Sequence, residues 1–136
     1  YRSISTNARL GGRKPIYCTG LGKTFLTFLP KEERDEIIRR IEFNPITHNT
    51  ITSKEKLYDQ LEVFEKQGYA VDNEEIEVGL WCAAAPVFGN SGRMEAAVSV
   101  SGPTARMLAN KEEIVSELLK VTRELSKQMG YSGEII

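Results

Sequence analysis

Three segments in the first half of the chain carry apolar residues at helical spacing. Residues 21–29 repeat them at positions i, i+4, i+7 and i+8, which predicts a short amphipathic helix that Pro30 ends. A second helix is predicted over residues 31–41, with an acidic start and a basic end that suit the helix dipole. A third begins after Ser53, a good N-cap residue, and closes at Gly68. The residues expected to face inward are Leu21, Phe25, Phe28, Leu29, Ile37, Ile38, Ile41, Leu57, Leu61 and Phe64.

Strands are predicted in the middle of the chain, where apolar and polar residues alternate with a period of two. Residues 69–71 form a short strand, residues 78–88 a longer one and residues 93–101 its return strand. The sequence GNSG between the last two is typical of a hairpin turn. Near the start of the chain, Pro15–Cys18 is also expected to be extended.

The last periodic segment predicts a C-terminal helix. Asn110 and Glu113 have the spacing of a capping box, and an apolar stripe of Ile114, Leu118, Val121 and Leu125 runs on toward Gly130. Helices before and after an antiparallel hairpin predict an α+β domain, in which helices pack on one sheet. A length of 136 residues suits a single domain with one substantial core.

Composition and charge exclude several classes of function. The 18 basic and 19 acidic residues give a net charge of −1, and the basic residues form no stripe that would bind nucleic acid. Cys18, Cys82 and the single histidine, His48, lack metal-ligand spacing, so neither a metal nor a cofactor is expected. Reduced thiols favour a cytoplasmic protein, and no apolar run is long enough to span a membrane.

The peptide CTGLGKT at residues 18–24 has the ending of a nucleotide-binding P-loop. A P-loop needs a further Gly five residues before its Gly-Lys pair, and that position is Tyr17. The dinucleotide-binding pattern fails as well, because Phe25 stands where its third Gly belongs. Neither nucleotide site is therefore predicted, and the two glycines need another explanation.

Small polar residues gather on one face of the predicted hairpin. Ser99 and Ser101 share a face of the return strand, and Leu80, Cys82 and Ala84 share a face of the strand before it. If the two faces coincide, the hairpin offers a small-residue surface with donors for a carboxylate or carbonyl oxygen. The pattern leaves open whether that surface is a pocket or a solvated face.

Neither a thiol nucleophile nor a cation site is favoured by spacing. Cys82 would need an activating base, and His48 lies in a distant connector with no carboxylate placed beside it, so a buried packing thiol is favoured. The acidic loop over residues 72–77 lacks the spacing and glycine of an EF-hand, and we expect it to be solvated. Asp72 is excepted from this prediction, because it directly follows an apolar strand.

Four motifs occur in order along the chain. CTGLGKTFLTFLP carries a Gly-Lys pair at a predicted helix start, preceded by Leu21 where a smaller residue is typical. GYAVDNEEIEVGLWCAAAPVF contains a Gly-Tyr-acidic stretch and a Gly-x-x-Cys-x-Ala-x-Pro-Val strand, and AAVSVSGP ends in a Ser-x-Ser-Gly-Pro strand end. Together, from about Pro15 to Gly130, they resemble the effector-binding domain of bacterial IclR-type transcription regulators. The resemblance implies a GAF-like α+β fold, a central antiparallel sheet flanked by helices, that senses small organic acids.

The resemblance also implies a ligand site. By motif its residues are Gly20, Leu21, Asp72, Leu80, Cys82, Ser99 and Ser101. The N–H groups of Gly20 and Leu21, at a helix N-terminus, would bind a carboxylate. The two serines and the thiol would donate to ligand oxygens, while Asp72 would accept from a ligand hydroxyl and the two leucines would wall the pocket.

Two lysines near this site are predicted to have different roles. Lys23 is predicted to be a surface or structural residue rather than a phosphate ligand. Lys14, where an apolar residue is expected, is either a solvated charge or a cation for a sugar acid.

The same resemblance implies how the whole protein is organised. Residues 1–136 are expected to be an effector-binding domain whose own start precedes Tyr1, with the winged helix-turn-helix DNA-binding domain outside this chain. DNA would be bound only through that domain, by a homodimer or homotetramer without enzymatic activity. The stretches GGRKPIYCTGLGK, DNEEIEVGLWC and LSKQMGY are most similar to the KdgR-like subgroup, regulators of pectin and hexuronate breakdown that respond to 2-keto-3-deoxygluconate. The alternatives are a thiol-dependent hydrolase using Cys82 and an oligomerisation module without a ligand.

Overall fold

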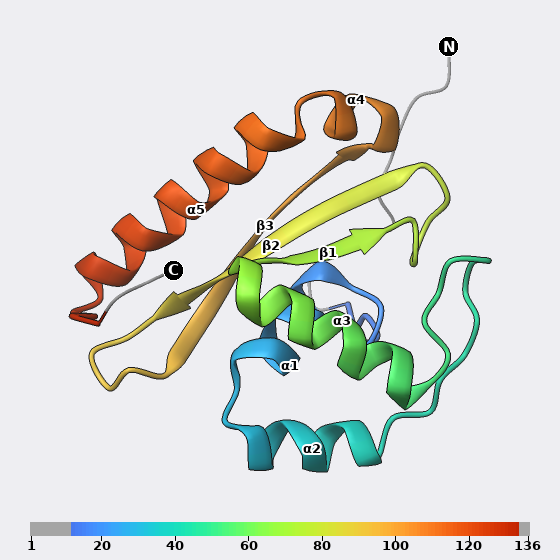
Figure 1. The fold of residues 1–136 in the computed structure, drawn as a ribbon, viewed down its shortest axis with the longest axis horizontal. Helices are drawn as coiled ribbons and strands as arrows, with labels where there is room; N and C mark the ends of the chain where they lie inside the picture. The colour runs from blue at the N-terminus through green and yellow to red at the C-terminus, as the bar shows by residue number, and fades with distance from the viewer. Residues whose placement is uncertain (1–11, 134–136) are drawn as a thin grey trace.

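A three-stranded antiparallel sheet lies between helices in the computed structural model, which describes residues 12–133 (Figure 1). The helices α1, α2 and α3 lie on one side of the sheet, and the long α5 runs across the other side. This arrangement confirms the predicted α+β fold with a central antiparallel sheet flanked by helices. The elements in chain order are α1 (Gly20–Phe28), α2 (Lys31–Arg39), α3 (Lys54–Gln67), β1 (Ala70–Asn73), β2 (Leu80–Phe88), β3 (Met94–Pro103), α4 (Thr104–Ala109) and α5 (Lys111–Gln128).

Local capping interactions fix the ends of α1 and α3. The Thr19 hydroxyl accepts a hydrogen bond from the Gly22 N–H at 3.1 Å, and the Ser53 hydroxyl accepts one from the Lys56 N–H at 3.2 Å. Gly68 ends α3 at a φ of 88°, a left-handed conformation that favours glycine. The predicted cap and closing residue of α3 are thus confirmed, because both signals are local.

Strand β2 separates two apolar clusters. Its odd-numbered residues Trp81, Ala83 and Ala85 pack with Met107 and Leu118 on the side of α5. Its even-numbered residues face α1, where small side chains allow the helix to approach the sheet closely. The second cluster, between α1, α2 and α3, consists of Tyr17, Cys18, Leu26, Ile38, Leu57, Leu61, Phe64 and Ala70.

Two local predictions are wrong, and one short helix is absent from the prediction. Residues 16–18 form a turn rather than an extended segment. The capping box of α5 does not form, because the Asn110 side chain donates to the Arg106 carbonyl at 2.9 Å and makes no hydrogen bond to the helix start. The short helix α4 between β3 and α5 was not predicted, since six residues carry too little periodicity to be recognised.

The inward faces of α1 and α5 also differ from prediction. In α1 the buried side chains include Lys23 and Leu26, whereas Leu21 is 41% exposed. In α5 the hydroxyl residue Ser126 is buried, while Val121 is exposed. Ser126 suits the helix–sheet contact because its hydroxyl accepts from the Phe88 N–H at 3.0 Å and donates to the Thr122 carbonyl at 2.7 Å.

Candidate functional site

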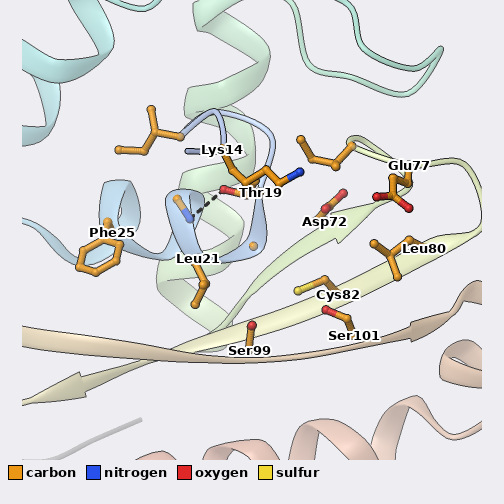
Figure 2. Close-up of a pocket in the computed structure, with 14 residues that line it drawn as sticks. Lys14, Thr19, Leu21, Phe25, Asp72, Glu77, Leu80, Cys82, Ser99 and Ser101 are labelled. Atoms are coloured by element: carbon orange, nitrogen blue, oxygen red, sulfur yellow. Dashed lines mark hydrogen bonds between the residues drawn. The ribbon is translucent and has the colours of Figure 1, made fainter. Parts of the chain in front are cut away.

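A pocket of about 580 Å³ opens between the N-terminus of α1 and the adjacent face of the sheet (Figure 2). This volume lies in the range of small-molecule sites. All seven residues predicted for the ligand site line it: Gly20, Leu21, Asp72, Leu80, Cys82, Ser99 and Ser101. Lys14, which the sequence analysis placed near the site, also lines the pocket, but the prediction missed Ile16, Thr19, Gly22, Phe25, Ile76 and Glu77. Of these, Phe25 carried a signal, since it follows Leu21 by four residues and therefore shares its helix face.

The floor of the pocket comes from β2 and β3. The strands pair so that Cys82 lies opposite Ser101, and Ala84 lies opposite Ser99. The thiol and both hydroxyls therefore share one face of the sheet, which confirms the coincidence of faces on which the prediction depended. Figure 2 shows both serine hydroxyls on the side of the pocket.

The first turn of α1 forms one wall. The hydroxyl of the cap residue Thr19 accepts a hydrogen bond from the Gly22 N–H, and the Thr19 carbonyl accepts one from the Lys23 N–H at 2.9 Å. The N–H groups of Gly20 and Leu21 are first-turn donors with no intrahelical acceptor, and the helix dipole favours an anion there. Glycine at position 20 allows α1 to approach β2 without displacing the Cys82 side chain, since a Cβ there would lie 2.9 Å from the Cys82 sulfur.

Asp72 forms the opposite wall. Its side chain is 4% exposed, and its Oδ1 accepts a hydrogen bond from the Glu75 N–H at 2.8 Å. The pKa of Asp72 is raised to about 6, mainly by burial and to a lesser extent by the negative charges of Glu75 and Glu77. The hydrogen bond from the Glu75 N–H and the positive charge of Lys23 oppose this rise. The prediction of a solvated acidic loop is therefore wrong for Glu75, which is buried; Asp72, which was excepted from that prediction, is buried as well.

The two lysines of the region have opposite environments. Lys23 is 0% exposed: its ammonium group donates to the Glu75 carboxylate and to Gln60 Oε1 at 3.0 Å. It is thus a structural and not a surface residue. Lys14 is exposed, and Figure 2 shows its side chain extending along the pocket toward Asp72 and Glu77.

The pocket does not provide the groups that a thiol hydrolase needs. Cys82 is 7% exposed, and burial raises its pKa, so little reactive thiolate forms near neutral pH. His48 is exposed in the connector before α3 and is not among the pocket-lining residues. Over residues 12–133, no cluster of potential ligands for a metal ion occurs, and no helix has the length and apolarity to cross a bilayer.

Cys82 is accordingly expected to react slowly with iodoacetamide at pH 7, because the reagent needs both access and thiolate. Alkylation followed by mass spectrometry should show at least about a tenfold slower modification of Cys82 than of free cysteine under the same conditions. Modification at the rate of free cysteine, or faster, would contradict the buried, unactivated thiol and revive the hydrolase alternative. Denatured protein, in which both thiols are accessible, is the control.

Comparison with known proteins finds similarity to bacterial transcriptional regulators, both in a family model and in a curated relative. The family model described as bacterial transcriptional regulator IclR C-terminal matches residues 1–127. The HTH-type transcriptional regulator KdgR of Dickeya chrysanthemi is 44% identical over 125 residues, which cover 91% of this chain and 41% of the relative. The chain therefore spans less than half the length of that relative.

Solved structures show the same similarity. The crystal structure of the C-terminal domain of the E. coli transcriptional regulator KdgR matches with a TM-score of 0.82 and 40% identity, over 88% of this chain and 74% of that one. A second match, with a TM-score of 0.80 and 26% identity, covers 93% of this chain and 73% of the solved chain. That structure is the double mutant of the PobR transcription factor inducer binding domain from Acinetobacter, in complex with 3-hydroxy benzoic acid.

Proposed function

Because the chain belongs to the IclR family of bacterial transcriptional regulators and corresponds to their C-terminal domain, we propose that it binds a small organic acid in the pocket between α1 and the sheet. Binding would modulate DNA recognition by the full-length regulator in the cytoplasm. A winged helix-turn-helix domain outside this chain would contact the operator, and a homodimer or homotetramer would set the spacing of those domains. The effector acts by favouring one arrangement of them over another.

The observation that carries this proposal is the polarity of the pocket. One end presents the N–H groups of Gly20 and Leu21 at a helix N-terminus, which suit a carboxylate. The floor presents the hydroxyls of Ser99 and Ser101, which donate to carboxylate or keto oxygens. The far wall presents Asp72, an acceptor that suits a ligand hydroxyl. A hydroxylated or keto acid fits this order of donors and acceptors.

Two comparisons support the same class of ligand. The PobR domain, with a similar fold, was solved with 3-hydroxy benzoic acid, which carries both a carboxylate and a hydroxyl. The resemblance to the KdgR-like subgroup makes 2-keto-3-deoxygluconate the first candidate, since it combines a 2-keto acid with several hydroxyls. In such a sugar acid complex, Lys14 at the pocket mouth would serve as a cationic donor.

The test is a thermal-shift screen of 2-keto-3-deoxygluconate, galacturonate, pyruvate and 3-hydroxybenzoate, followed by calorimetry on any acid that stabilises the chain. A ligand that binds only the folded state raises the melting temperature according to its concentration relative to Kd. We expect the double variant Ser99→Ala/Ser101→Ala to weaken binding at least about tenfold, because each lost hydrogen bond contributes about 1 kcal/mol. The control Ser91→Ala/Ser116→Ala removes two exposed serines outside the pocket and should leave Kd within about twofold.

Two outcomes would overturn the proposal. If none of the acids stabilises the chain while it still self-associates, the domain is an oligomerisation module. If an acid binds with an unchanged Kd in the Ser99→Ala/Ser101→Ala variant, it binds elsewhere on the molecule.

A further inference from the structure

A buried ion pair lies behind the Asp72 wall of the pocket. Lys23 donates to the carboxylate of Glu75, which is 3% exposed, and the Lys23 nitrogen lies 5.3 Å from the centre of the Phe64 ring. Removing two charges from water costs several kcal/mol, and well-packed apolar residues of similar volume are often at least as stabilising. Stability alone is therefore a weak reason for a charged pair at this position.

The pair connects two walls of the pocket. Lys23 belongs to α1, whose first turn is the wall proposed to bind the ligand carboxylate, whereas Glu75 belongs to the loop between β1 and β2. The Glu75 N–H donates to Asp72 Oδ1 at 2.8 Å, and its carbonyl accepts from the Thr50 hydroxyl at 2.7 Å. Glu75 is thus held by its side chain, its N–H and its carbonyl, and one of these bonds fixes the orientation of Asp72.

We propose that Lys23 and Glu75 are positioning residues for ligand recognition, which tie α1 to the β1–β2 loop so that Asp72 presents a carboxylate oxygen to a hydroxyl of the bound acid. This inference rests on the proposed function. Because the Glu75 N–H bonds to Oδ1, Oδ2 of Asp72 is the oxygen left for the ligand. The pocket then selects acids with a hydroxyl at the end remote from the carboxylate, and disfavours acids that are apolar there.

The charges around Asp72 support this orientation of the ligand. The groups facing it are Lys23, Glu75 and Glu77, with Lys14 at the pocket mouth. With a pKa of about 6, Asp72 is ionised at neutral pH and can only accept hydrogen bonds. It therefore repels a ligand carboxylate, which leaves the N-terminus of α1 as the favourable place for that group.

The first test needs no ligand. Carbon-13 NMR of the side-chain carboxyls should show Asp72 titrating near pH 6, and Glu75→Gln should lower its pKa, because a neighbouring negative charge is removed while Lys23 keeps its positive charge. The control Glu65→Gln removes an exposed carboxylate of α3 and should leave the Asp72 titration unchanged. An Asp72 titration that is the same in Glu75→Gln as in the unaltered chain would overturn the coupling.

The second test is a double-mutant cycle with 2-keto-3-deoxygluconate as the probe, measured by calorimetry at pH 7.5. Asp72→Asn and Glu75→Gln should each weaken binding about tenfold, which corresponds to one lost charge-assisted hydrogen bond. The double variant should be no more than about twofold weaker than Asp72→Asn, because Glu75 acts through Asp72. A roughly hundredfold, additive loss would show that Glu75 acts independently and would overturn the inference.

Failure of this inference can be separated from failure of the proposed function. If the unaltered chain binds none of the acids in the screen, the proposed function falls, and the ligand-free titration alone then decides whether Glu75 controls Asp72. If Glu75→Gln does not fold, the neutral pair Lys23→Met/Glu75→Met replaces it in the cycle, with the same expected non-additivity.

Discussion

Replacing Gly22 with alanine is expected to lower the free energy of unfolding by about 3 kcal/mol or more. A Cβ at this position would lie 2.3 Å from the Ile16 carbonyl oxygen, 2.6 Å from the Ile16 Cα and 2.6 Å from the Thr19 hydroxyl oxygen. The first two of these atoms belong to the backbone, so no rotation of a side chain relieves the overlap. The turn over residues 16–18 and the cap of α1 must both shift to make room.

Urea denaturation followed by circular dichroism measures this effect. Gly102→Ala is the matched control, because its Cβ would meet only the Met107 side chain, 2.8 Å from Sδ, which can move aside. We expect that control to cost less than about 1.5 kcal/mol. Equal losses for the two variants would show that the segment before α1 adapts more easily than its backbone contacts imply.

Replacing Lys23 with methionine is expected to cost about 3–5 kcal/mol at pH 7.5, because it leaves the buried Glu75 carboxylate without its cation. Burial raises the pKa of Glu75, and Lys23 opposes that rise, so loss of Lys23 raises this pKa further. A carboxyl with a raised folded-state pKa binds more protons in the folded than in the unfolded state, so its stability contribution is present at low pH and lost as pH rises. The deficit of Lys23→Met should therefore shrink when unfolding is measured at pH 5.

The double variant Lys23→Met/Glu75→Met should recover most of the loss, since it removes both charges and keeps the volume filled. Lys66→Met, which removes an exposed lysine of α3, should stay within about 0.5 kcal/mol of the unaltered chain. A double variant no more stable than Lys23→Met would mean that the pair contributes by packing and not by charge compensation.

The parts of this fold that could be predicted are those that depend on neighbouring residues. The cap at Ser53, the stop at Gly68 and the alternation of Ser99 and Ser101 all follow from spacing within a few residues. The same alternation places Cys82 on the face of the sheet that carries Ser99 and Ser101, so the floor of the pocket could be predicted from the sequence.

The parts that were not predictable depend on contacts between distant segments. Lys23 is buried because its partner, Glu75, lies 52 residues further along the chain, and no local pattern indicates that pairing. Leu21 and Phe25 were assigned to the core because apolar periodicity does not distinguish a side chain that packs against protein from one that lines a cavity. The same limit explains α5, where the hydroxyl residues Thr122 and Ser126 are buried and form hydrogen bonds.

The alternation along β2 and β3 divides the sheet into two sets of positions that can change separately during evolution. Residues 80, 82, 99 and 101 face the pocket, while residues 81, 83, 98 and 100 belong to the cluster under α5 or pack against it. Substitutions in the first set would change the groups that line the pocket without replacing any residue of the cluster under α5. One scaffold can therefore acquire new chemical preferences through a few substitutions, and the PobR domain, at 26% identity, still has the same fold.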